Sequence, residues 1–118
     1  KALELLAMSF LENLYRNKSL VQIMTMEAYS HQKQAKMIYK NLIEKVFHHF
    51  EEYLVGLSAH KNFRKFSSPL VARAFFGMFF FYFINQEFFF EKEISKFKKK
   101  EVVREYVDLF MKGIEKDG

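Results

Sequence analysis

The stretch LVARAFFGMFFFYFINQEFFF, residues 70–90, constrains the fold more than any other part of the chain. Ser68 followed by Pro69 is typical of an N-cap with proline at the first helical position, so we expect a helix from here to about Glu87. At 100° per residue, apolar side chains cover nearly its whole circumference. Such a helix is buried on two sides or lies in lipid.

We favour burial over a membrane span because polar residues interrupt the helix at both ends. Arg73 lies near its start and residues 85–87 near its end, which leaves Ala74 to Ile84 uninterrupted. A spanning helix needs roughly 20 apolar residues. We therefore expect a soluble protein in which one face of the helix packs on its own core and the other on a second subunit.

The two faces of this helix differ in the size of their side chains. The broader face carries Val71, Phe75, Met78, Phe79, Tyr82 and Phe83, and the narrower face carries Leu70, Ala74, Gly77, Phe81 and Phe88. Small residues one turn apart, Ala74 and Gly77, would let a partner helix approach closely. The alternative is that Gly77 relieves crowding among large side chains within one subunit.

The composition favours a single all-α domain over residues 1–118. Half of the residues are hydrophobic and sixteen are phenylalanine, but only four are glycine and one is proline. A chain with so few turn residues forms a few long helices more readily than many short strands. We predict an antiparallel bundle of about five helices. Cysteine is absent, which excludes disulfides and thiolate metal sites and suits the cytoplasm.

The net charge of +5 does not indicate a nucleic-acid surface, because basic and acidic residues are interleaved. Only KFKKK, residues 96–100, forms a local basic run, which we interpret as a solvated loop in preference to a phosphate-binding patch. No signal peptide is visible and the first residue is lysine, so we expect the natural N-terminus to be missing.

Apolar periodicity predicts the remaining helices. The first runs from Ala2 to Arg16, and Asn17 caps a short second helix. Ser30 caps a long third helix over residues 31–57. One buried stripe runs along it at Ala35, Ile38, Leu42, Val46, Phe50, Tyr53 and Leu57, and its edge is broadened by Tyr39, Ile43, Phe47 and Leu54. Residues 59–67 connect it to the central helix, held down by Phe63 and Phe66. Residues 88–100 are a loop or frayed extension, and the last helix covers Glu101 to Ile114.

The sequence contains few residues suited to catalysis. Glu44, His48 and Glu52 share a helix face at spacings of four and could offer ligands to a divalent metal. That face lies away from the apolar stripe, where glutamate and histidine are ordinary solvated residues, so we predict no metal and no cofactor. Glycine-rich phosphate loops, nucleophile elbows and zinc-protease motifs are absent, so we predict that the protein is not an enzyme.

Taken together, the order of elements resembles the C-terminal effector-binding and dimerisation domain of tetracycline-repressor-like (TetR) transcriptional regulators. The matching pieces are the first-helix pattern ending FLENLYRNKSLVQIM, the long third helix, the central ARAFFGMFFFYF, and the last helix VVREYVDLFMKGI, whose FMKGI resembles the usual end of that family's last helix. Residues 88–100 depart from the simplest family pattern. The helix-turn-helix that defines the family is not in this chain.

The resemblance implies that the last two helices form a four-helix bundle with their symmetry mates and that the first four enclose a ligand cavity. The predicted dimer interface comprises Leu70, Ala74, Gly77, Phe81, Val103, Phe110 and Ile114. The predicted cavity wall comprises Phe10, Leu14, Met24, Phe47, Phe50, Phe79 and Tyr82, with Tyr82 as polar anchor.

The function that follows is a ligand-responsive regulatory module. A small apolar or aromatic effector would favour one arrangement of the helices and change DNA binding by an N-terminal helix-turn-helix outside this chain. The alternative is a helical dimerisation or adaptor domain with a solid core and no ligand. A third hypothesis is a peripheral membrane module that uses KFKKK and the neighbouring phenylalanines.

Overall fold

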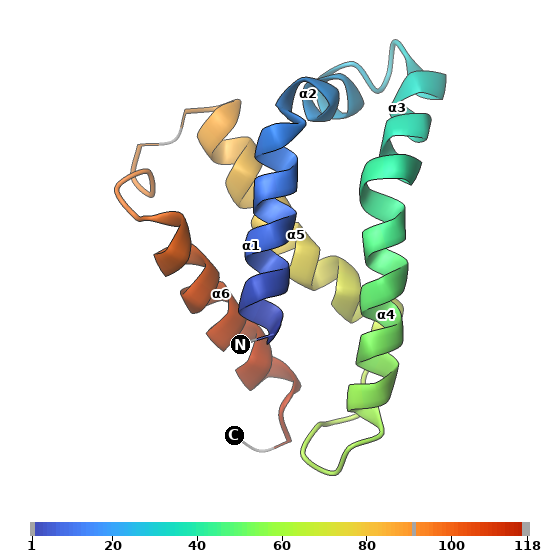
Figure 1. Cartoon of the computed structure of the whole chain (residues 1–118), viewed down its shortest axis with the longest axis vertical. Coiled ribbons are helices and arrows are strands. Elements are labelled where there is room, and N and C mark those ends of the chain that lie inside the picture. The colour runs from blue at the N-terminus through green and yellow to red at the C-terminus, as the bar shows by residue number, and fades with distance from the viewer. Residues whose placement is uncertain (1, 91, 117–118) are drawn as a thin grey trace.

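The computed structural model describes residues 2–90 and 92–116, and all regular secondary structure in this part is helical (Figure 1). This confirms the all-α class. The helices are α1 (Ala2–Arg16), α2 (Lys18–Met26), α3 (Gln32–Tyr39), the π-helix η1 (Lys40–Glu44), α4 (Lys45–Ser58), α5 (Ser68–Glu87) and α6 (Lys99–Ile114).

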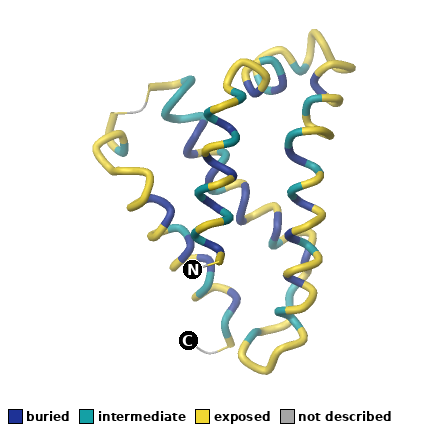
Figure 2. The backbone as a smooth tube through the Cα atoms, viewed as in Figure 1, coloured by how far each residue is buried: buried dark blue, intermediate teal, exposed yellow. Residues whose placement is uncertain are grey.

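Helix α5 occupies the middle of the fold (Figure 1). It packs against α1 and α4 over most of its length and against α6 to a smaller extent, while α6 packs mainly on α1. Helices α2 and α3 pair with each other at one end of the molecule. Figure 2 shows buried positions recurring along the helices with exposed positions between them, as amphipathic packing requires.

The inner face of α5 forms the centre of the core. Its large buried side chains are Phe75, Phe76, Phe79, Tyr82 and Phe83. The Phe75 ring lies 4.7 Å from the Phe50 ring of α4 and 4.8 Å from the Phe110 ring of α6. The prediction that Phe75, Phe79 and Phe83 meet the other helices is therefore confirmed. Phe76, which the sequence analysis assigned to neither face, is also buried.

The helix starts differ from the predicted caps. Asn17 occupies the cap position of α2, but its side chain accepts no bond from α2, and its Nδ2 donates to the Asn13 carbonyl oxygen at 2.9 Å. Its backbone dihedral angles, φ −110° and ψ 33°, are not those of an α-helix, so the chain bends here between α1 and α2. His31, not Ser30, occupies the N-cap position of α3, and Ser67, not Ser68, occupies that of α5, but neither side chain forms a capping hydrogen bond.

The long third helix contains a π-helical segment that the sequence did not predict. Helices α3, η1 and α4 follow one another without a gap, and η1 holds more residues per turn than an α-helix. This shifts the buried stripe in the second half of the run. Ile43 and Phe47, predicted at its edge, are buried, whereas Tyr53, predicted at its centre, is exposed.

The connection between α4 and α5 is fixed to the end of α6. Phe63 and Phe66 pack against the core, as predicted. The Arg64 backbone N–H donates to the Ile114 carbonyl at 3.0 Å, and its Nε donates to the Gly113 carbonyl at 2.7 Å. A guanidinium at this position satisfies carbonyls that the end of a helix leaves unpaired, and its charge suits the helix dipole.

Among the residues described, α5 is the helix that could cross a membrane by length and composition alone, with 20 residues and a mean hydropathy of 1.3. Its inner face is nevertheless filled by phenylalanines that pack on α1 and α4. This packing is that of a core helix in a globular protein.

Candidate functional site

A pocket of about 320 Å³ lies where α5 faces the corner formed by the other helices. It is lined by Phe10 of α1, Met24 and Thr25 of α2, Tyr39 of α3, Ile43 of η1, Phe47 of α4, and Arg73, Phe76, Gly77 and Phe80 of α5. Six helical elements thus contribute to its wall. Its size and largely apolar lining are those of a site for a small ligand.

The wall of this pocket is built by two irregularities of the chain. Met24 follows the junction between α1 and α2 at Asn17, and Ile43 lies within η1, one turn before Phe47. Phe76 forms the floor, because its ring lies 4.7 Å from Phe10 and 5.3 Å from Phe47. An aromatic floor with a thioether beside it offers a polarizable surface to an apolar ligand.

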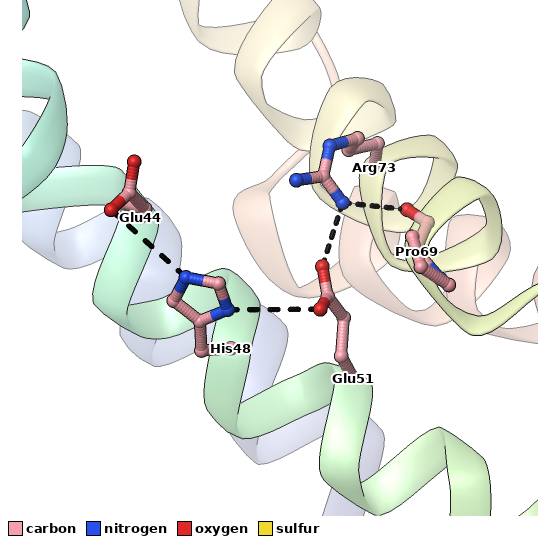
Figure 3. A network of polar contacts seen from close by, with 5 residues as sticks. All are labelled: Glu44, His48, Glu51, Pro69 and Arg73. Carbon is pink, nitrogen blue, oxygen red and sulfur yellow. Dashed lines mark hydrogen bonds and ion pairs between the residues drawn. The ribbon is translucent and has the colours of Figure 1, made fainter.

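Arg73 is the charged residue at the rim of the pocket. Its Nη1 donates to Glu51 Oε2 at 2.7 Å and to the Pro69 carbonyl at 2.9 Å (Figure 3). Its guanidinium carbon lies 5.2 Å from the centroid of the Phe47 ring. These contacts fix the direction of a long side chain, so that the charge stays at the mouth while the interior remains apolar.

Two residues of the candidate metal-binding set, Glu44 and His48, form part of this polar network. His48 lies between two carboxylates, 3.7 Å from Glu51 Oε1 and 4.0 Å from Glu44 Oε1 (Figure 3). Glu52 of the predicted set is not in the network. Over residues 2–90 and 92–116, no three histidine, aspartate or glutamate side chains are grouped to hold a metal ion.

The structure brings together three of the seven predicted cavity residues: Phe10, Met24 and Phe47 line the pocket. Leu14 and Phe79 are fully buried in the packed interior. Phe50 lines a depression between α1 and α4, and Tyr82 lines a cavity between α5 and α6. Sequence reasoning missed the other lining residues, four of which lie on α5, because periodicity gives the apolar face of a helix but not which helices converge on it.

Tyr82 therefore lies away from the pocket it was predicted to anchor. Burial raises the pKa of its phenol, as does the field of Tyr106 and Glu87. The half-buried Tyr15 is perturbed in the same direction, because burial and the neighbouring Tyr82 and Glu87 raise the pKa of its phenol well above its usual range. Lys18 Nζ lies 2.9 Å from Glu87 Oε1 and balances that carboxylate.

The α5 residues of the predicted interface lie on the surface. Leu70 is 70% exposed and Phe81 is 64% exposed, and Ala74 and Gly77 between them are exposed as well. We call these four residues the outer face of α5. Gly77 belongs both to this face and to the wall of the pocket.

The α6 residues of the predicted interface lie elsewhere. Val103, Phe110 and Ile114 are buried in the core of the protomer, so they present no surface to a partner. The reason is that α6 turns its apolar side toward α1 and α5. Leu109, 64% exposed, is a large apolar side chain that α6 directs outward.

Comparison with known families agrees with this architecture. The family model for the AefR-like transcriptional repressor C-terminal domain matches residues 1–113. The chain therefore belongs to this family of TetR-type C-terminal domains. No curated protein and no solved structure matches the chain.

Proposed function

We propose that this domain binds a small apolar or aromatic effector in the pocket between α5 and the α1–α4 helices. The observation that supports this most is the lining itself, in which four phenylalanines, an isoleucine and a methionine from different helices surround about 320 Å³. Membership of a repressor C-terminal family supports a regulatory role for such a pocket. Occupation of the pocket would favour the arrangement of helices that fits the ligand best.

Helix α5 links the pocket to the proposed dimer interface. Phe76 and Gly77 line the pocket, and the same helix carries the exposed residues Leu70 and Phe81. A ligand that shifts α5 by a small amount changes the contact between subunits, and the coupling free energy acts equally in both directions. In the intact cytoplasmic regulator, this change would alter the spacing of two N-terminal DNA-binding domains.

Ligand binding can be tested with 2-naphthol, a small fluorescent aromatic probe, by thermal unfolding of the purified domain. The Thr25→Phe variant places a phenyl ring inside the pocket, whereas Met26→Phe places one on the exposed side of the same helix. We expect 2-naphthol to stabilise the wild type and Met26→Phe but not Thr25→Phe. At a hundredfold excess over the Kd, the stabilisation is about 2.7 kcal/mol.

Two outcomes would contradict the proposal. If neither 2-naphthol nor other apolar probes stabilise the wild type, the domain is a dimerisation or adaptor domain without a ligand. If Thr25→Phe binds 2-naphthol as strongly as the wild type does, the ligand occupies another part of the molecule.

A further inference from the structure

A second cavity, of about 280 Å³, lies between the end of α5, the segment leading into α6, and α6 itself. It is lined by Tyr82, Ile94, Phe97, Glu101, Val102, Glu105 and Tyr106. None of the residues that line the first pocket takes part in it. It also involves residues 88–100, the stretch that departs from the simplest family pattern.

The two cavities differ in chemistry. Three aromatic rings, those of Tyr82, Phe97 and Tyr106, form the walls of the second cavity, and two carboxylates, those of Glu101 and Glu105, stand at its edge. No lysine or arginine lines it. Aromatic faces carry negative electrostatic potential, and a carboxylate beside them adds a full negative charge.

The two carboxylates are not neutralised by basic side chains. Glu101 Oε1 accepts a hydrogen bond from the Lys98 backbone N–H at 2.9 Å, and this capping contact involves no cationic group. The Glu105 side chain forms no hydrogen bond or ion pair with any residue that the structure describes. Both carboxylates therefore remain available to a positively charged ligand.

The nearby lysines contact aromatic rings, one outside the cavity and one in its wall. Lys99 Nζ lies 3.9 Å from the centroid of the Tyr15 ring, outside the cavity, and Lys96 Nζ lies 5.5 Å from the centroid of the Phe97 ring. Both contacts show that aromatic rings at this end of the molecule accept cations. Lys96 thus lies over the Phe97 ring of the cavity, whereas Tyr82, Tyr106 and the two carboxylates have no cation–π contact or ion pair with a lysine or arginine among residues 2–90 and 92–116.

We infer that this cavity binds a small organic cation of the quaternary ammonium class. The methyl groups of such a ligand would lie against Tyr82, Phe97 and Tyr106, and its charge would face Glu101 and Glu105. A quaternary ammonium has no N–H groups and loses less hydration than a primary amine, so aromatic walls suit it better. This binding is independent of the apolar effector proposed for the first pocket.

The test compares choline with 3,3-dimethylbutan-1-ol, which has the same shape but a carbon atom in place of the charged nitrogen. Binding to the intact chain is followed by saturation-transfer NMR. We expect choline to bind at least about tenfold more tightly than the alcohol, which corresponds to the strength of a partly desolvated cation–π contact. Equal binding of the two compounds, or no binding of choline, would overturn the inference.

Variants locate the site. Phe97 and Glu105 are exposed, so Phe97→Leu and Glu105→Gln should fold normally, which circular dichroism can verify. Each should weaken choline binding by roughly fivefold, the effect of one exposed cation contact. Glu52→Gln on α4, which removes the same charge far from the cavity, should leave choline binding unchanged. If Glu52→Gln has an equal effect, choline responds only to net charge, and the inference fails.

A competition experiment separates this inference from the proposed effector function. Saturating 2-naphthol should not displace choline, because the two cavities share no lining residue. Displacement of choline by 2-naphthol would mean that both probes occupy one site, which would overturn the assignment of choline to the second cavity.

Discussion

The two faces of α5 are both apolar but lie in opposite environments. On the inner face, Phe75, Phe79 and Phe83 have no exposed surface at all. The Phe75 ring contacts α4, α6 and the Phe79 ring, and the Phe83 ring contacts Tyr15 of α1. On the outer face, Leu70 and Phe81 are mostly exposed. The chain has thus placed phenylalanine where a neighbouring helix packs and also where none does.

This difference indicates where the fold is complete and where it is not. The inner face already has its partners within the protomer, so its contribution to stability is realised in a single chain. The outer face leaves apolar surface in water, which is unfavourable by roughly 25 cal/mol per Å². A second copy of the same face would cover it, in keeping with the symmetric interfaces common among homodimers.

The largest expected effect is a loss of stability when a buried ring is removed from the inner face. Phe79→Ala removes a ring that is fully buried and contacts Phe75 and Tyr106. We expect a loss of about 3–5 kcal/mol in the free energy of unfolding, because the cavity left behind adds to the lost burial. Urea denaturation followed by circular dichroism measures this loss.

The matched substitution on the outer face is Phe81→Ala. In dilute protein it should change the free energy of unfolding by no more than about 0.5 kcal/mol. If Phe81→Ala were as destabilising as Phe79→Ala under these conditions, the two faces would not differ as described.

The next effect concerns association through the outer face. Gly77→Glu introduces a charge where two backbones would approach, and Phe81→Arg would place a charge beside its own symmetry mate. Each should raise the dissociation constant of the dimer at least about tenfold, which corresponds to about 1.4 kcal/mol in the free energy of association. Sedimentation equilibrium measures the dissociation constant.

The control for association is Glu105→Arg on the exposed side of α6, which should leave the dissociation constant unchanged. A wild-type protein that remains a well-folded monomer at micromolar concentration would contradict the proposed dimer.

A smaller effect, in the opposite direction, is expected for Gly77→Ala. A Cβ atom added at Gly77 meets no atom within 4 Å. Alanine favours the middle of a helix over glycine by about 0.5–1 kcal/mol, so the protomer should become more stable by this amount. The measurement is best made in the Phe81→Arg background, where dimerisation does not contribute. A loss of stability there would indicate crowding that the structure does not show.

The smallest effect is a pH dependence of the free energy of unfolding, which arises at Tyr15 of α1, beside Phe83 of the inner face. Burial, Tyr82 and Glu87 raise the pKa of Tyr15 in the folded protein, whereas in the unfolded chain it titrates near 10. The unfolded state therefore loses this proton first, and the free energy of unfolding falls as the pH rises above about 10. Tyr15→Phe should make that fall less steep in urea titrations between neutral and alkaline pH. An unchanged slope would show that Tyr15 does not contribute.

Much of the secondary structure could be predicted from local pattern. The bounds of α1 agree with its periodicity, and the division of α5 into a Phe75–Phe79–Phe83 side and an exposed side is correct. The family resemblance was also correct. These features depend on residues close together in the sequence.

The pocket was predicted only in part, for a physical reason. Phe10, Met24 and Phe47 come from three helices, and their convergence depends on the bend at Asn17 and on η1. A π-helical segment moves every later side chain around the axis, but no residue type marks it. Ile43 lies within this segment and lines the pocket, although its spacing alone predicts only the edge of the stripe.

Helix α6 shows the same limit in another form. Its apolar arc is wide enough to face either a partner or the protomer's own core. Periodicity predicts which residues form the arc, but not which helices pack against it. The structure turns Val103, Phe110 and Ile114 inward.

The sequence by itself determined an all-helical chain with one helix apolar on all sides, because helix formation and turn formation depend on neighbouring residues. Only the tertiary structure decided which phenylalanines lie inside, which side of α6 meets the core, and where two chemically different cavities form. A helix that is apolar all round gains similar burial energy in many orientations, and only the shapes of the helices packed against it select one.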